Sequence, residues 1–489
     1  MRTRSQLPQV QSGHRRERPL KISSQIDLES IANHARTQHV SSFMASPDLR
    51  HLDTLRRIWG HPRVGREEIL AFRNRRLRQI VDYASQNVPF YRELFARSGL
   101  KARDLRTAED LRQLPISSAQ DFRSLPAEQV LSPRFNAAKL VSRSTSGTSG
   151  RPFTVRRGAI EDHLLNFFRL RAEAQYGVRR QDIQAIVAFL SRSHRRNSWP
   201  GSLRQKLGLY RRFGVNCLGS AEEILSAIRK IRPDVLNGFA GALAFAGQHA
   251  SGFEDSPHPR IAITGGETLT AFRRSQIERG FDCRAFSIYG SHEFNVLAFQ
   301  CPESNRFHTC DDNVVLEVLR DDQPVEPGEL GEVVATGLHS HAMPFLRYRL
   351  GDVARQGHGL CECGQPFSTL LDVRGRMHDY FRMPDGSLLH PDRLVVPIME
   401  NESGWFEQYQ LVQEHEDTVV LRVNPSSTPN EGQLRHVEDL ARNQLPEGVS
   451  FSVELVDHLP PEPSGKQRYC KSLVNPRIDD FDWSDRGVD

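Results

Sequence analysis

The sequence lacks any apolar run long enough to cross a membrane, and it contains few cysteines. Its most apolar stretch, residues 236–250, is broken after about a dozen residues, whereas a transmembrane helix needs roughly 20, so we interpret it as a buried core segment. The first thirty residues contain no apolar segment typical of a signal peptide. Seven cysteines among 489 residues are too few for a disulfide scaffold. These absences predict a cytoplasmic protein without a transmembrane segment.

An excess of positive charge is also missing from most of the chain. The net charge is +5, and residues 1–25 carry six basic side chains against one acidic side chain, so the remainder is close to neutral. A short basic segment with serine and glutamine predicts a disordered tail, which we assign to residues 1–50. Basic and aromatic side chains do not interleave in the rest of the chain, so we expect no nucleic-acid partner.

Apolar runs of strand length alternate with helical patterns through the middle of the chain. This alternation predicts an α/β fold with a substantial sheet. The expected strands are 185–190, 261–264, 286–289, 314–319 and 332–338, and the expected helices include 66–85, 159–176, 221–231, 240–250 and 268–280. Beyond residue 376, expected strands at 409–413, 418–424 and 450–456 surround a helix at 430–444. We therefore predict a large α/β domain over residues 51–376 and a small, mobile α+β domain over residues 377–489.

Residues 144–152 read STSGTSGRP and form the strongest local motif. Interleaved glycines and hydroxyl side chains expose backbone N–H groups and hydroxyl donors, which suits phosphate oxygens. No lysine follows Gly150, so the segment is not a Walker loop. A flexible Ser/Gly linker is the alternative, but a linker does not require a helix to follow directly. The motif favours a phosphate-binding loop.

Three further segments place a carboxylate where we expect a strand end or a tight turn. They are the TGGE segment 264–267, the YGSHE segment 289–293 and the RYRLGD segment 347–352. Ligands of α/β sheets bind at such strand ends. In this order, with Gly375-Arg376 and the PSGK segment 463–466 following, the set resembles the adenylate-forming superfamily. The branch that it resembles contains phenylacetate–CoA ligases and relatives in capsule biosynthesis, and the resemblance covers about residues 55 to 475.

The resemblance implies binding of ATP, Mg²⁺ and a carboxylic acid, and it implies a role for each motif residue. The phosphate loop would comprise Ser144, Thr145, Ser146, Gly147, Thr148, Ser149 and Gly150. Gly265, Gly266 and Glu267 would line the adenine, and Tyr289, followed by Gly290, would stack on it. Glu293 would hold Mg²⁺, Asp352 would accept the ribose hydroxyls, and Arg376 would contact phosphate or ribose. Lys466 would reach the α-phosphate during adenylation.

The sequence departs from the family pattern at two positions. His292 precedes the acidic residue where a hydroxyl residue is usual, and it would contribute to catalysis through a hydrogen bond to phosphate or substrate oxygens. His378 occupies the position at which the small domain is expected to turn, where Asp or Lys is usual.

Four residues offer a complete donor set for zinc. Cys301 and His308 form one pair, and Cys361 and Cys363 form a second pair, with 52 residues between the two pairs. Three thiolates and one imidazole fill a tetrahedral site, so we expect a structural rather than a catalytic ion. The resemblance implies the same, since members of this branch carry a structural zinc. Buried reduced thiols with a surface histidine are the alternative, and Cys310 is a spare candidate ligand.

The sequence thus predicts ATP-dependent activation of a carboxylic acid, aromatic in our interpretation, followed by transfer of the acyl group to CoA. Transfer to an amine or hydroxyl acceptor is the runner-up, and a lapsed enzyme that only binds is a third alternative. We expect the acid pocket to draw on residues 236–245, 265–270 and 289–297. Its apolar side chains, among them Phe239, Phe245 and Phe294, would look the same in an ordinary core.

Overall fold

A computed structural model describes residues 49–145, 153–188, 211–217, 219–250, 257–376, 380–389, 391–459 and 470–474. The chain divides into two units, residues 1–56 and residues 57–489. The boundary falls within helix α2 (Leu49–Gly60). The expected tail, residues 1–50, lies almost wholly outside the described residues.

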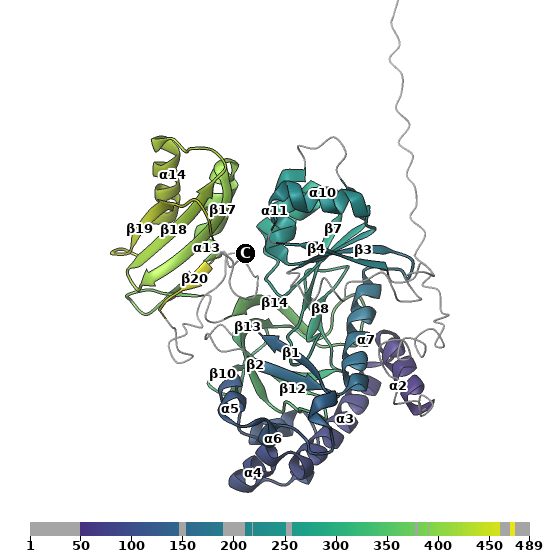
Figure 1. The fold of residues 1–489 in the computed structure, drawn as a ribbon. Helices are drawn as coiled ribbons and strands as arrows, with labels where there is room; N and C mark the ends of the chain where they lie inside the picture. The colour runs from purple at the N-terminus through teal and green to yellow at the C-terminus, as the bar shows by residue number, and fades with distance from the viewer. Residues whose placement is uncertain are drawn as a thin grey trace, which may run out of the picture. The chain divides into compact units, whose positions relative to one another are not determined.

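A sheet of twelve strands runs through the second unit, in the order β11-β10-β12-β13-β14-β9-β8-β7-β6-β5-β3-β4 (Figure 1). Five neighbouring strands at one end are parallel. They are β4 (Arg211–Asn216), β3 (Ile183–Ala188), β5 (Val235–Gly238), β6 (Ile261–Gly265) and β7 (Arg284–Tyr289). Their carboxyl ends therefore meet at one edge, where an α/β sheet binds ligands.

The other seven strands are antiparallel to their neighbours. They are β8 (Ala298–Gln300), β9 (Phe307–Thr309), β10 (Val314–Arg320), β11 (Gln323–Pro324), β12 (Leu330–Gly337), β13 (Tyr348–Gln356) and β14 (Thr369–Arg376). Strands β14 and β9 pair at only two positions, Thr369 with His308 and Leu370 with Phe307. We call this short pairing the β14–β9 junction. Strand β14 begins 60 residues after β9 ends, whereas most other paired strands of the antiparallel part follow one another closely in sequence.

Helices cover both faces of the parallel strands. Helices α10 (Ala221–Ile231), α11 (Ala240–Ala250) and α12 (Ala271–Phe281) pack on one face, and α7 (Ala159–Gln175) packs on the other (Figure 1). Neighbouring residues of a strand point to opposite faces, so Ala285 faces α12 while Phe286 stacks on Tyr176, 4.4 Å between ring centroids. A Cβ at Gly280 would lie 2.0 Å from the Gly247 carbonyl oxygen, so α11 and α12 approach through glycine.

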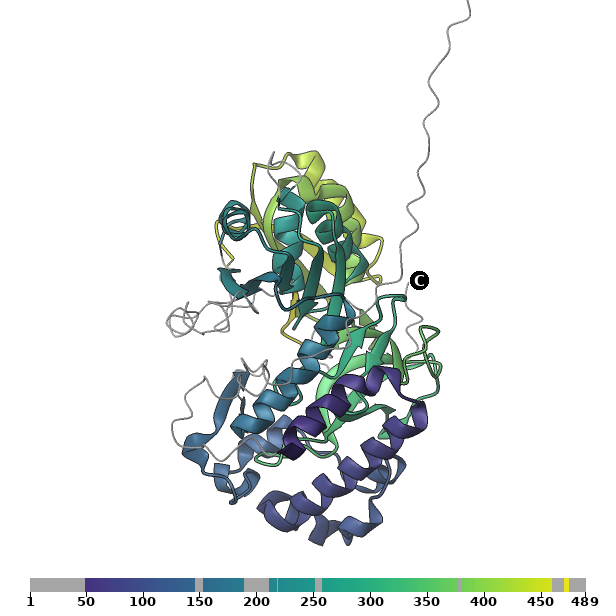
Figure 2. The same cartoon turned by 90° about the vertical axis from the view of Figure 1, so that its right-hand side faces the viewer.

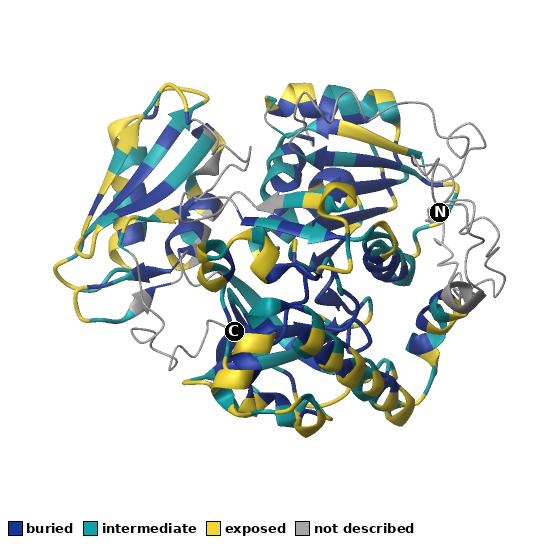
Figure 3. Ribbon diagram, turned by 60° about the horizontal axis from the view of Figure 1, so that its bottom comes forward, coloured by how far each residue is buried: buried dark blue, intermediate teal, exposed yellow. Residues whose placement is uncertain are grey.

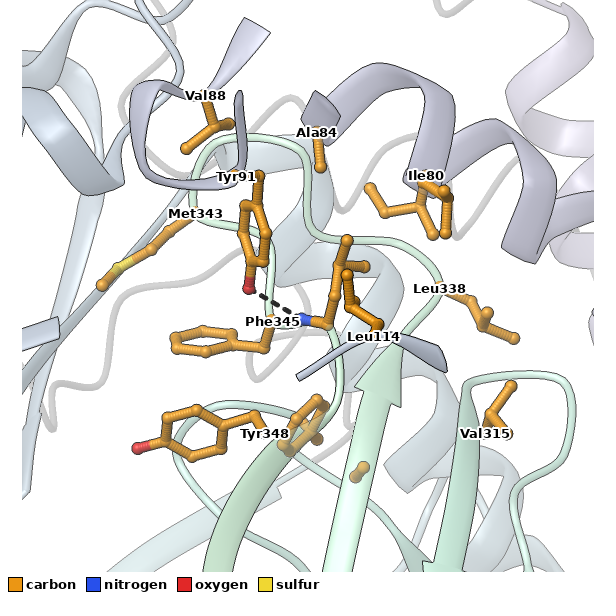
Figure 4. Packing of buried hydrophobic residues seen from close by; sticks show 14 of the residues in the cluster. Ile80, Ala84, Val88, Tyr91, Leu114, Val315, Leu338, Met343, Phe345 and Tyr348 are labelled. Carbon is orange, nitrogen blue, oxygen red and sulfur yellow. Dashed lines mark hydrogen bonds between the residues drawn. The ribbon is translucent and has the colours of Figure 1, made fainter. Parts of the chain in front are cut away.

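A second group of helices covers the antiparallel strands. They are α3 (Arg66–Asn87), α4 (Pro89–Ser98), α5 (Ala119–Ser124) and α6 (Ala127–Val130), with the 3₁₀ turns His61–Arg63, Ala102–Asp104, Glu109–Gln113 and Ala137–Lys139 (Figure 2). Tyr91 of α4 lies at the centre of their core (Figure 4). Its hydroxyl accepts the Leu346 N–H at 2.8 Å and donates to the Pro344 carbonyl at 3.1 Å, which fixes the chain that leads into β13.

The chain beyond β14 forms a second sheet with its own core. Its order is β19 (Ser450–Leu455), β18 (Thr418–Pro425), β17 (Phe406–His415) and β20 (Cys470–Ser472). Helices α13 (Asp392–Glu402) and α14 (Glu431–Arg442), the 3₁₀ turn Ser403–Trp405 and a short hairpin of β15 (Phe381–Arg382) and β16 (Leu388–Leu389) complete it. This composition matches the α+β elements expected there, while the domain boundary at residue 376 stays a prediction.

Burial follows the layers, with the strands of the large sheet mostly buried and exposed residues on the outer helices (Figure 3). No described helix is long and apolar enough to cross a membrane. The expected strands and helices agree with the structure to within a few residues. The α/β class is confirmed.

Candidate active site

The expected phosphate loop lies between two paired strands in the sequence. Strands β1 (Val141–Thr145) and β2 (Phe153–Arg157) pair antiparallel, with Thr145 opposite Phe153. Residues 146–152, including Ser146, Gly147, Thr148, Ser149 and Gly150, lie outside the described residues, as do the side chains of Ser144 and Thr145. The hairpin ends directly before α7, so the proposed loop is anchored at both ends.

The TGGE motif follows strand β6, as the sequence predicts. Gly265 ends the strand, and Gly266 adopts a positive φ of 78° in the turn after it. An oxygen of Glu267 accepts the Gly241 N–H at 2.7 Å and lies 3.9 Å from a guanidinium nitrogen of Arg273. This carboxylate therefore joins the ends of β5 and β6.

The YGSHE motif follows strand β7 at the same edge of the sheet. Tyr289 ends the strand, and Gly290 begins a turn that folds back so closely that a Cβ at Gly290 would lie 1.9 Å from the Asn295 carbonyl oxygen. Only glycine fits there. His292 has an exposed side chain, whereas Glu293 is 8% exposed and accepts a hydrogen bond from the Tyr348 hydroxyl at 3.1 Å.

Asp352 lies inside strand β13, which corrects the expectation that its motif forms a strand end or tight turn. Near Asp352, the pairing of β13 shifts register against both neighbouring strands. The shift against β12 lies between Glu332 and Val334, and the shift against β14 lies between Val353 and Ala354. Such irregularities bend a strand and re-aim its side chains. The Asp352 carboxylate is 8% exposed and accepts a hydrogen bond from the Tyr289 hydroxyl at 2.7 Å.

The structure thus brings together two pairs of motif residues from distant parts of the chain, Tyr289 with Asp352 and Glu293 with Tyr348. Arg376 is the last residue of β14, paired with Asp352 in the ladder, so its backbone lies beside that residue. Its side chain, His378 and the entire PSGK segment with Lys466 lie outside the described residues.

Two residues of the site were missed by the sequence reasoning. Asn313 donates to the carbonyl oxygens of Phe294 and Val296, at 3.1 and 2.6 Å, and so supports the turn behind Glu293. Arg157 donates to the His292 carbonyl from the other side. Neither residue belongs to a motif, and each contact spans more than a dozen residues in sequence. Tyr348 was part of a quoted motif, but no role was given to it.

One cavity contains part of the expected acid pocket. Phe239 and Phe245 come from one expected range and Glu267 from another. The lining also includes residues outside the expected ranges, among them Met399, Phe406, Gln408 and Tyr409. Phe294, by contrast, is 2% exposed and packs against Phe345 at 5.8 Å between ring centroids. Phe294 is therefore a core residue, the alternative that the sequence left open.

The four candidate zinc ligands converge. One donor atom from each of Cys301, His308, Cys361 and Cys363 lies within 4.8 Å of the others. Burial lowers the pKa of His308 to about 4, which leaves the ring neutral and able to offer Nε2, 3.3 Å from Cys363 Sγ. Cys310 lies apart in the apolar core beside Arg171. The three thiols and one imidazole fit a tetrahedral zinc ion.

Known proteins resemble the chain in sequence and in fold. The phenylacetate-coenzyme A ligase of Thermus thermophilus is 26% identical over 64% of this chain and 72% of its own length. The protein CapK of Staphylococcus aureus is 21% identical over 82% of this chain and 89% of its own length. A 2-hydroxyisobutyryl-CoA ligase in complex with an acyl-AMP superposes with a TM-score of 0.70 over 86% of this chain and 92% of its own, at 20% identity. No protein-family model matches the chain. The comparisons confirm the predicted resemblance and the two-domain fold of adenylate-forming enzymes.

Proposed function

We propose that the chain is an AMP-forming acid–thiol ligase. The observation that carries the proposal is the hydrogen bond between Tyr289 and Asp352, with Glu293 four residues further along the same turn. The three groups lie around the carboxyl end of β7. The ring of Tyr289 suits a base, the two carboxylate oxygens of Asp352 suit a ribose diol, and the buried acid Glu293 suits a metal-bound phosphate. The similarity to phenylacetate-coenzyme A ligases agrees with the predicted enzyme class.

In the first half-reaction, a carboxylate oxygen of the acid forms a bond to the α-phosphorus of ATP, and pyrophosphate leaves. The phosphate loop would hold the β- and γ-phosphates, Asp352 the ribose and Glu293 a Mg²⁺ ion, which supplies charge neutralisation at the phosphates. Lys466 would add a positive charge at the α-phosphate. His292 would hydrogen-bond phosphate or substrate oxygens from its exposed position.

In the second half-reaction, a thiol attacks the acyl carbon and AMP leaves. The proposed acceptor is CoA, because a solved ligase of the same fold binds an acyl-AMP together with CoA. The chain also resembles CapK over 82% of its length, and transfer to an amine or hydroxyl acceptor is the second candidate. ATP and CoA are cytoplasmic cosubstrates, so we place the reaction in the cytoplasm.

We propose an aromatic or similarly flat apolar acid as the substrate. Support comes from Phe239 and Phe245 in the cavity beside Glu267. The cavity also contains small residues, Gly241 and Ala242, which leave room for a ring. The zinc ion is proposed as a structural ion, because four protein ligands leave no open position for a substrate.

ATP–pyrophosphate exchange over a panel of acids tests the proposal. Exchange with an aromatic acid is the expected result, and absence of exchange with every acid would support the binding-protein alternative instead. A second assay then separates the acceptors: release of AMP that depends on added CoA supports the ligase. AMP release with hydroxylamine or an alcohol, but not with CoA, would favour the second candidate.

A further inference from the structure

Arg157 is a buried arginine at the end of strand β2, just after the proposed phosphate loop. Its side chain is 2% exposed. Burial lowers the pKa of its guanidinium, and the nearby carboxylates of Asp162 and Glu293 act in the opposite direction. Arginine keeps its charge even so, so a cation lies beneath the turn that carries Glu293. Burying a charge is costly unless the charge has a task or a partner.

The guanidinium of Arg157 links two parts of the site. One terminal nitrogen lies 3.4 Å from an oxygen of Asp162, and the other donates to the backbone carbonyl of His292. The third nitrogen, Nε, has no hydrogen-bond partner among the described residues. The guanidinium therefore holds the His292 peptide beside Asp162.

Asp162 extends the link to the other strand of the hairpin. Arg143, on β1, donates to both of its oxygens at 3.0 and 2.9 Å. Asn166, one turn further along α7, donates to Asp162 at 3.1 Å and accepts from Asn295 at 2.9 Å. The hairpin and the 290–296 turn are thus joined through one carboxylate. Asn295 itself has a positive φ of 64°, a conformation that needs support in a residue other than glycine.

We propose that Arg157 is a positioning residue for adenylation, which fixes the His292–Glu293 peptide against the phosphate-loop hairpin. This inference rests on the proposed function. Loss of Arg157 would remove its hydrogen bond to the His292 carbonyl, while Asn313 would still hold the carbonyls of Phe294 and Val296. Glu293 would then lose its fixed position relative to strand β2.

The test compares Arg157→Gln and Arg157→Lys with Arg156→Gln in the full chain. Arg156 lies on the opposite face of β2 and is part of no proposed contact. Hydrogen exchange of amides 290–296 gives a readout independent of turnover. We expect it to accelerate by about tenfold or more in Arg157→Gln, since a hydrogen bond from a charged donor is lost. Amides of β3 should not change, and Arg157→Lys should fall between the wild type and Arg157→Gln.

Pyrophosphate exchange at varied Mg²⁺ concentration supplies the second readout. In Arg157→Gln we expect the half-saturating Mg²⁺ concentration to rise by about tenfold, for the same reason, while the ATP dissociation constant measured in EDTA stays unchanged. The inference would be overturned if Arg157→Gln had the same hydrogen exchange at amides 290–296 and the same Mg²⁺ dependence as the wild type. Faster hydrogen exchange at the amides of β3 would also overturn it, because Arg157 would then support the fold as a whole. Absence of exchange activity in the wild type would contradict the proposed function instead.

Discussion

The hydroxyl of Tyr289 donates a hydrogen bond to Asp352 at 2.7 Å, although their strands are not neighbours in the sheet. Strands β8, β9 and β14 lie between β7 and β13. Four strand spacings would place the two residues about 19 Å apart in a flat sheet. The sheet must therefore curve until the strands face each other. A small core that includes Ala298, Val333 and Leu370 fills the concave side.

Tyr289→Phe should weaken ATP binding by about three- to tenfold, because it removes one hydrogen bond worth about 1 kcal/mol while the ring remains to stack on the base. Titration calorimetry with ATP measures the change. Tyr289→Leu removes the ring as well and should weaken binding further. Equal affinities for the phenylalanine variant and the wild type would show that Asp352 needs no support from Tyr289.

Glu293→Gln should abolish Mg²⁺-dependent pyrophosphate exchange while the protein stays folded. Glutamine keeps an oxygen that can accept from Tyr348, 3.1 Å away in the wild type, but it lacks the negative charge that a divalent cation prefers. Circular dichroism checks that the variant is folded, and pyrophosphate-exchange assays check that its activity is lost. Near-normal exchange in the variant would assign the magnesium to another residue.

Lys466→Ala should collapse formation of the acyl-adenylate by orders of magnitude, since an aligned charge at a developing anion contributes several kcal/mol. Conversion of a pre-made acyl-adenylate by CoA should survive, because that step is expected to use a second domain orientation. Single-turnover assays separate the steps. If the variant loses both steps equally, Lys466 has a structural role, and if it loses neither, the PSGK resemblance is misleading.

The purified protein should contain about one zinc ion per chain, because four donors converge within 4.8 Å. Metal analysis by mass spectrometry checks the content. Cys363→Ser should lose the ion, while Cys283→Ser, a half-buried thiol outside the cluster, should retain it. Metal-free protein with all thiols reduced would leave the four residues as ordinary core side chains.

Asp312→Asn should destabilise the fold by about 3–5 kcal/mol, because it leaves the buried Arg171 guanidinium without its ion-pair partner. Burial alone would raise the pKa of Asp312, but Arg171, donating at 2.9 Å, and His61 outweigh it and hold the pKa well below its usual range. The stabilisation is therefore complete above about pH 4, the unfolded-state pKa, and is lost on acidification below it.

Urea unfolding at pH 7 and pH 3 measures both effects. Glu93→Gln, which breaks an exposed ion pair with Arg97, is the matched control and should change stability by less than about 1 kcal/mol. A stability of Asp312→Asn equal to the wild type at pH 7 would show that the buried pair costs as much in desolvation as it contributes.

The sequence predicted the elements whose apolar residues are continuous or periodic, such as the parallel strand at 261–265 and the helix at 221–231. Strand β13 was missed because its burial does not alternate, and three register shifts interrupt its pairing. The motif residues were named from short segments of sequence, and their roles rest on the resemblance. Arg157 and Asn313 could not be found, since their roles depend on backbone carbonyls brought close only by the fold.

The cluster of Cys301, His308, Cys361 and Cys363 shows the same limit. The residue types and the short spacing within each pair indicated these four as candidate ligands. Their convergence depends on the pairing of Thr369 with His308, which no local pattern encodes.

The β14–β9 junction has a consequence for how the protein opens and folds. Strands β10 to β14 follow one another in sequence and pair with near neighbours, so they can form early as one cooperative unit with low contact order. The junction has only two residue pairs, as does the pairing of β7 with β8, so we expect the sheet to open most readily at these two places. Three of the four candidate ligands lie outside its strands, and the fourth, His308, lies within it. An ion bound there would hold the junction closed. It would therefore determine how often β7 separates from β13, and Tyr289 from Asp352.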